Sequence, residues 1–157
     1  MERRNVLRLF LASSVGAVIS PNFVFGKNPF QQHLDFSQLD FGPDFKWGVA
    51  TSAFQIEGAH QLDGKSASIW DTFSHEKGKI KTGENGDVAC DFYHSYEQDL
   101  DLLKSLNMTV FRFSISWCRV LPNGTGEPNQ KGIDFYHRVI DACLERGIEP
   151  WLTLYHW

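Results

Sequence analysis

From residue 45 onwards, segments with the spacing of strands alternate with segments with the spacing of helices. Residues 45–53, 109–117 and 148–157 are short and mostly apolar, as buried strands are. Residues 91–106 and 133–144 place apolar side chains three and four positions apart, as amphipathic helices do. The order strand, helix, strand, helix, strand predicts parallel strands covered by helices, which is an α/β fold. It leaves open whether the sheet is open or closes into a barrel.

Two glycines and one long polar segment refine this prediction. Gly48 lies inside the first strand, where the lack of a side chain permits close approach of another backbone. Arg146 and Gly147 supply an end for the second helix. Residues 58–88 are rich in Gly, Asp, Lys, Ser and Thr, but they include the apolar island SIWDTF at residues 68–73. Large apolar groups need packing partners, so we expect an ordered loop near a functional site.

Composition and charge narrow the class of protein. Hydrophobic residues make up 42% of the 157, which is enough for a core. The net charge is -4, and no run of Lys or Arg could follow the phosphates of a nucleic acid, so nucleic acid is not expected as a partner.

The three cysteines, Cys90, Cys118 and Cys143, lack the spacing of a zinc site or a disulfide framework. Cys118 and Cys143 are interpreted as small buried hydrophobes. The sequence leaves the oligomeric state open.

The N-terminal segment differs from the rest of the chain. Arg3, Arg4 and Arg8 precede an apolar run at residues 9–19 that is shorter than the roughly 20 residues of a membrane span. Residues 1–26 are therefore predicted to be an export signal and not a stable membrane anchor. The paired arginines fit a twin-arginine signal, and an ordinary secretory signal fits equally well. The predicted location is periplasmic or extracellular.

Between this signal and the strands, residues 27–43 are polar with scattered aromatics. They are interpreted as a linker or N-terminal arm, and residues 44–157 as the folded part.

Polar side chains occur where each predicted strand ends. In a barrel of parallel strands, functional residues lie at the C-terminal ends, and Gln55, His156 and Trp157 are at such positions. Imidazole next to a flat indole suits a pyranose, which has both hydroxyls and an apolar face. Arg112 lies within an apolar strand and should face an anion, because an unpaired buried guanidinium is costly. None of the three strands supplies an obvious carboxylate for it.

Four separate motifs carry a family resemblance. They are FKWGVATSAFQIEGA at residues 45–59, SIWDTF at 68–73, FRFSISW at 111–117 and TLYHW at 153–157. Together, in this order, they resemble glycoside hydrolase family 1, the β-glucosidase family, over residues 41–157. The resemblance implies a (β/α)8 TIM barrel, an α/β fold of which about the first three βα strands are present. It implies hydrolysis of terminal β-D-glycosides with retention, with no metal or organic cofactor.

The resemblance also implies roles for individual residues. Gln55 and His156 would hydrogen-bond hydroxyls of a β-linked glucoside or oligosaccharide, and Trp157 would shape the same subsite. Arg112 would hold the nucleophilic carboxylate of the family. The motifs of the two catalytic Glu residues are absent from the sequence, so this stretch is predicted to be inactive alone, because retention needs both carboxylates. Glu57 is interpreted as structural, like the packing residues Trp117 and Trp151 and the caps and surface charges Asp71, Asp91 and Asp99.

A rival prediction stays open. A fold does not determine an activity, so a non-catalytic glycan-binding or interaction protein could share this architecture. The enzyme and the non-catalytic protein would differ in the two catalytic carboxylates, and neither motif occurs in residues 1–157. The sequence does not specify which sugar is preferred.

Overall fold

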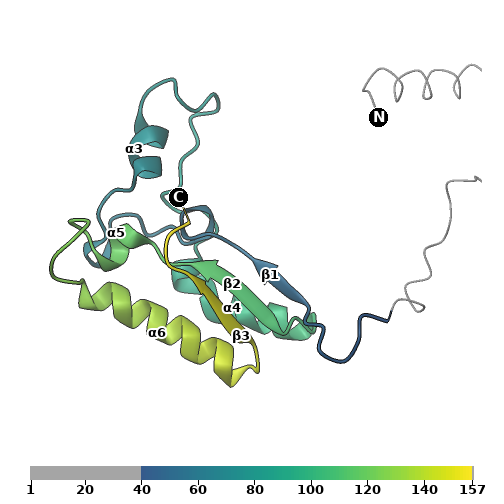
Figure 1. Ribbon diagram of the computed structural model, residues 1–157. Coiled ribbons are helices and arrows are strands. Elements are labelled where there is room, and N and C mark those ends of the chain that lie inside the picture. The colour runs from purple at the N-terminus through teal and green to yellow at the C-terminus, as the bar shows by residue number, and fades with distance from the viewer. Residues whose placement is uncertain (1–39, 157) are drawn as a thin grey trace, which may run out of the picture. The chain divides into compact units, whose positions relative to one another are not determined.

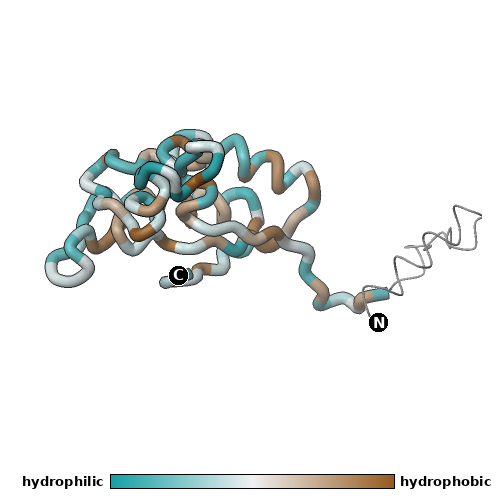
Figure 2. The backbone as a smooth tube through the Cα atoms, turned by 90° about the horizontal axis from the view of Figure 1, so that it is seen from above, coloured by the Kyte–Doolittle hydropathy of each residue, from teal (hydrophilic) through white to brown (hydrophobic). Residues whose placement is uncertain are grey.

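The computed structural model describes residues 40–156. The predicted export signal, most of the predicted arm and the predicted sugar contact Trp157 lie outside the described residues. The chain divides into two units after Gly42, and residues 43–157 form the larger compact unit. Within residues 40–156, no helix has the length and apolar character needed to cross a membrane. Apolar and polar residues alternate along the coloured part of the chain in Figure 2.

Three parallel strands form the sheet in the order β1-β2-β3 (Figure 1). They are β1 (Gly48–Ala50), β2 (Val110–Ser114) and β3 (Glu149–Thr153). Gly48 pairs with Val110, and a Cβ at Gly48 would lie 2.7 Å from the carbonyl oxygen of Val110. The predicted close approach of two backbones is confirmed, as is the α/β arrangement of parallel strands joined by helices.

Two long helices cover one face of the sheet. They are α4 (Phe92–Ser105) and α6 (Gln130–Glu145), which pack against each other and share one core with β2 (Figure 1). Gly147 follows α6 with φ +74°, the left-handed conformation that ends a helix, as predicted. The buried residues of this core are Phe92, Tyr93, Leu100, Phe111, Phe113, Phe135, Tyr136, Val139, Ala142, Cys143 and Ile148.

Short helices replace parts of the predicted strands and loop. The predicted strand 45–53 ends early, and α2 (Ala53–Ile56) follows it; the predicted strand 109–117 likewise gives way to α5 (Trp117–Val120). The long loop contains the 3-10 turn η2 (Leu62–Gly64) and α3 (Ile69–His75). In both places the apolar residues favour a strand, but the backbone turns into a helix where pairing with the neighbouring strand stops.

Three packing predictions need correction. Trp117 and Trp151 were expected to pack in the barrel, but they are 40% and 51% exposed. Their indole N–H groups bond to the Gly124 carbonyl and the Glu149 carboxylate, respectively. Cys118 is only partly buried, whereas Cys143 is buried as predicted. Apolar character alone does not place a side chain, because many apolar residues of folded chains remain accessible.

Candidate active site

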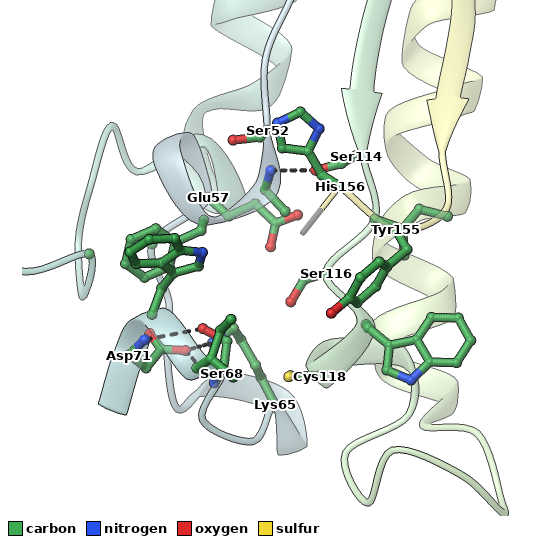
Figure 3. Close-up of a pocket in the computed structure, with 18 residues that line it drawn as sticks. Ser52, Glu57, Lys65, Ser68, Asp71, Ser114, Ser116, Cys118, Tyr155 and His156 are labelled. Atoms are coloured by element: carbon green, nitrogen blue, oxygen red, sulfur yellow. Dashed lines mark hydrogen bonds and ion pairs between the residues drawn. The ribbon is translucent and has the colours of Figure 1, made fainter. Parts of the chain in front are cut away.

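The C-terminal ends of the strands meet at one end of the sheet. Directly after β1, β2 and β3 come α2, α5 and residues 155–156, and α3 lies beyond that end (Figure 1). A cavity of about 180 Å³ is lined by residues from all four segments (Figure 3). This is the end of a parallel α/β sheet at which ligands bind, because the strand-to-helix turns converge there.

A buried carboxylate forms part of the cavity wall. Glu57 is 4% exposed, and its two oxygens have separate partners. Arg119 Nε donates to Oε2 at 3.1 Å, and the Tyr136 hydroxyl donates to Oε1 at 2.5 Å. Burial raises the pKa of Glu57, because the loss of solvation outweighs the attraction of Arg119 and the Tyr136 hydrogen bond. The same burial, together with Glu57, raises the pKa of Tyr136 well above its usual range.

The guanidinium that neutralises Glu57 is itself fully buried. Arg119 is 0% exposed and lies over two aromatic rings, with its Cζ 4.5 Å from the centroid of Tyr93 and 5.5 Å from that of Phe135. Its Nη2 donates to the Gly58 carbonyl at 3.4 Å. Aromatic faces stabilise a cation that has lost its water. Glu57, Arg119 and Tyr136, here called the buried cluster, therefore join three segments of the chain.

A second carboxylate lines the cavity and is also paired. Asp71 accepts from Lys65 Nζ at 2.8 Å and from the Ser68 backbone N–H at 2.7 Å. The Ser68 hydroxyl accepts from the Asp71 N–H, which completes a capping box at the start of α3. Burial raises the pKa of Asp71, but Lys65 and Ser68 more than compensate, and the net shift is downward. The interpretation of Asp71 as a cap is confirmed.

Of the predicted sugar contacts in the described chain, the structure brings one to the cavity. His156 lines it together with Tyr155 and Ser116 (Figure 3). Gln55 has an exposed side chain outside the cavity lining, and its Oε1 accepts from the Ser52 hydroxyl at 2.6 Å. The two residues therefore do not line one cavity in residues 40–156, and their joint role in one subsite stays a prediction.

Arg112 lies on the sheet face opposite the core. Its neighbours along β2, Phe111 and Phe113, point into the core, and strand alternation turns Arg112 away from it. Its Nε donates to Thr153 Oγ1 at 2.7 Å on the neighbouring strand. Within residues 40–156 no carboxylate forms an ion pair with Arg112. The role of Arg112 in holding a nucleophilic carboxylate stays a prediction.

A sequence comparison identifies the family to which these features belong. The profile of "Glycosyl hydrolase family 1" matches residues 37–157, well over half of the chain. The chain belongs to glycosyl hydrolase family 1. It is 56% identical over 121 residues to β-glucosidase A of Acetivibrio thermocellus. The matched residues are 77% of this chain and 27% of the relative. It is 53% identical over 123 residues to β-glucosidase 40 of Arabidopsis thaliana, with 78% and 24% covered.

Solved structures of the family agree with the fold. The family 1 β-glucosidase from Thermotoga maritima superposes with a TM-score of 0.73 at 54% sequence identity, over 74% of this chain and 26% of that one. The same enzyme has been solved in complex with castanospermine and with deoxynojirimycin. The three strands and their helices are the first part of a (β/α)8 barrel, as predicted. The chain spans about a quarter of the length of these family 1 relatives.

Sequence reasoning missed most of the polar groups of this family 1 site. The partners of Glu57 are 62 and 79 residues away along the chain, and nothing in the sequence links them. Lys65 likewise looked like one of many loop charges. The capping box could have been found, because the pattern Ser-x-x-Asp at residues 68–71 is a known helix start.

Proposed function

We propose that the protein of which this chain is part hydrolyses terminal β-D-glycosides with retention, as a β-glucosidase. The observation that carries this proposal is the identity of 54–56% over 117–121 residues with relatives named β-glucosidase, together with a family match over residues 37–157, which include Gln55, Arg112 and His156. In this proposal the substrate is a β-linked glucoside or oligosaccharide. Gln55 and His156 hydrogen-bond its hydroxyls, and Trp157 shapes the same subsite.

The chemistry needs carboxylates that this stretch does not offer. Retention uses a nucleophile and an acid/base about 5 to 5.5 Å apart. The carboxylates that line the described cavity, Glu57 and Asp71, are already held by Arg119 and Lys65. In this proposal Arg112, which forms no ion pair with a carboxylate of residues 40–156, holds a nucleophile from another part of the barrel. In this proposal residues 1–157 bind and position the sugar, and the reaction needs the rest of the family domain.

The first test compares the protein as its gene encodes it with the chain that ends at Trp157. We expect the former to hydrolyse an aryl β-glucoside and to release β-glucose first, as observed by NMR. We expect no turnover by the latter. Hydrolysis by the purified 157-residue chain would contradict the assignment of both carboxylates to another part. Binding of deoxynojirimycin without any turnover would favour the glycan-binding alternative.

The second test concerns the predicted sugar contacts. His156→Ala and Gln55→Ala should each lower kcat/KM by at least about tenfold, because each removes a hydrogen bond that strengthens in the transition state. His137→Ala is the matched control, since His137 is an exposed residue of α6. Equal kcat/KM values in all three variants would refute the assigned roles.

We also propose that residues 1–26 direct export of this enzyme. The support is the pair Arg3 and Arg4 before the apolar run at residues 9–19. Replacing both arginines by lysine should block export if the signal is of the twin-arginine type and should leave it intact if the signal is an ordinary secretory one. Cell fractionation and N-terminal sequencing of the exported product measure the outcome. Full activity confined to the cytoplasm of the native host would refute export.

A further inference from the structure

Two histidines and one carboxylate of the long loop between α2 and α4 lie close together. His60 follows α2, His75 is the last residue of α3, and Asp87 comes from the segment that leads to α4. One ligand atom from each lies within 4.8 Å of the other two. Asp87 Oδ1 lies 3.1 Å from His75 Nε2 and 3.6 Å from His60 Nδ1. These three residues are here called the His–His–Asp cluster.

The spacing of the cluster fits a metal ion with short bonds. Ligand atoms about 2.0 to 2.1 Å from a tetrahedral Zn²⁺ are separated by about 3.3 Å. Asp87 Oδ1 lies 3.1 and 3.6 Å from the two histidine nitrogens, on either side of this value, and all three ligand atoms lie within 4.8 Å of one another. The imidazole rings of His60 and His75 are stacked, with centroids 5.7 Å apart, so both present their edges to the same carboxylate. Small side-chain rotations would suffice to bring all three atoms onto one ion.

The second nitrogen of His75 is fixed in the way that metal ligands usually are. His75 Nδ1 lies 2.7 Å from the carbonyl oxygen of Asp71, which can only accept, so Nδ1 carries a proton and donates it. Nε2 is thereby the nitrogen directed at Asp87. A ligating histidine typically donates its other N–H to a carbonyl or carboxylate, which sets the tautomer and the ring orientation.

The carboxylate has an oxygen that is buried without a hydrogen bond. Among the described residues, Asp87 Oδ1 is one of three buried side-chain atoms that accept or donate none. The two histidine nitrogens are its close polar neighbours, and Oδ2 is the atom that pairs with His75 in hydrogen-bonding geometry. A metal ion on Oδ1 would supply the missing interaction.

We propose that His60, His75 and Asp87 bind a divalent transition-metal ion, with Zn²⁺ as the best match and water as the fourth ligand. Two imidazoles and one carboxylate are a common zinc donor set. Mg²⁺ and Ca²⁺ prefer sites made of oxygen ligands only, so two imidazoles disfavour them.

The role that follows is structural, because the ion would tie together the two ends of the loop beside the cavity. Gly58 and Val88 are already in close contact, since a Cβ at Gly58 would lie 2.1 Å from the Val88 carbonyl oxygen. Gly86, next to Asp87, lines the cavity, as do Ile69 and Trp70 of α3. The ion would hold this wall in place and takes no part in bond cleavage.

The direct test is metal titration of the protein as its gene encodes it, after treatment with a chelator. Co²⁺ is the probe, because its visible absorption reports tetrahedral N/O ligation, and Zn²⁺ then competes with it. Asp87→Asn keeps the shape of the side chain but removes its charge, and His75→Ala removes a ligand. Loss of an outer-shell partner alone costs about 10- to 100-fold in affinity, so each variant should bind at least about 100-fold more weakly. His137→Ala, an exposed histidine of α6, is the matched control and should bind one equivalent like the unmodified protein.

A second readout follows the loop itself. Exposed Lys77, Lys79 and Lys81 lie between His75 and Asp87, so trypsin can report on the segment that the ion would clamp. One equivalent of Zn²⁺ should slow cleavage at these lysines in the unmodified protein and in His137→Ala, but not in Asp87→Asn. The proposal would be overturned if all variants bound Co²⁺ with equal affinity. It would also be overturned if the unmodified protein bound Co²⁺ no more tightly than His75→Ala does. Far-UV circular dichroism without metal establishes that Asp87→Asn is folded.

Discussion

The buried cluster and the His–His–Asp cluster are both built around a carboxylate from the region between β1 and α4, but they differ in how that carboxylate is satisfied. Glu57 has a guanidinium and a phenol as partners, and Arg119 and Tyr136 are themselves buried. Asp87 has only imidazoles near its inner oxygen, and the side chain of His75 is 43% exposed. Both oxygens of Glu57 are hydrogen-bonded, whereas Asp87 Oδ1 is buried without a hydrogen bond.

The difference shows that a carboxylate can serve two purposes in one protein, stabilising the fold or binding a ligand. A buried charge must be neutralised by the fold, and its loss of solvation makes each partner indispensable. The side chain of Asp87 is 29% exposed, so it keeps part of its water, its protein partners contribute little to stability, and its inner oxygen can bind a ligand. Substitutions in the buried cluster should therefore affect stability strongly, whereas those in the His–His–Asp cluster should affect metal binding.

The largest effect is expected from Arg119→Met. Methionine keeps an unbranched apolar side chain at this buried position but removes the guanidinium, so Glu57 is left buried without its cation. Removing one partner of a buried pair costs about 3 to 5 kcal/mol of unfolding free energy. Urea denaturation at pH 7 measures it. The double variant Glu57→Leu, Arg119→Met should recover much of the loss, and an unchanged midpoint in Arg119→Met would show that the pair does not stabilise the fold.

A smaller loss is expected from Tyr136→Phe. The hydroxyl donates to Glu57 at 2.5 Å and accepts the Ser116 backbone N–H at 2.6 Å, so its removal takes one partner from each group. Glu57 keeps Arg119 and Ser116 is only partly buried, so we expect a total loss of about 1 to 3 kcal/mol. Tyr96→Phe is the matched control, because that hydroxyl contacts the exposed Glu97. Equal unfolding free energies for the two variants would contradict the importance assigned to the buried cluster.

The pH dependence of stability offers a third test. Burial raises the pKa of Glu57 in the folded state above that of the unfolded chain. Its protonated form is thus favoured by folding, so this contribution is fully present below the unfolded pKa of about 4.5 and is lost as the pH rises through the folded pKa. In Glu57→Gln, which cannot ionise, the fall in unfolding free energy over this window should be weaker. Identical profiles would mean that Arg119 fully offsets the burial of Glu57.

Much of the fold could be predicted from local patterns. The periodicities of α4 and α6, the glycine after α6 and the apolar strand β2 each follow from residues close in sequence. The extent of the strands could not, because sheet pairing with a distant segment determines where a strand ends. Gln55 and His156 were predicted from their place near strand ends, and Arg112 from its charge within an apolar strand, together with the family motifs.

Neither the buried cluster nor the His–His–Asp cluster could be predicted from local sequence patterns, and the physical reason is the same for both. Glu57 finds Arg119 and Tyr136, and His60 finds Asp87, only after the chain has folded. Their spacings in sequence match no known motif, unlike the capping box of α3, which joins residues three apart. A metal site is visible in sequence when its ligands come in closely spaced pairs, and His60, His75 and Asp87 are 12 or more residues apart.

The smallest effect on stability is expected from Asp87→Asn in the absence of metal. Its partners are partly exposed histidines, and exposed pairs contribute about 0 to 1 kcal/mol. The unfolding free energy of the chelated protein should therefore change by no more than about 1 kcal/mol. With Zn²⁺ at 100 times its dissociation constant, the unmodified protein should gain about 2.7 kcal/mol, and the variant should gain almost nothing. A large loss in the chelated variant would instead make Asp87 a structural residue of the same kind as Glu57, and the contrast between the two clusters would disappear.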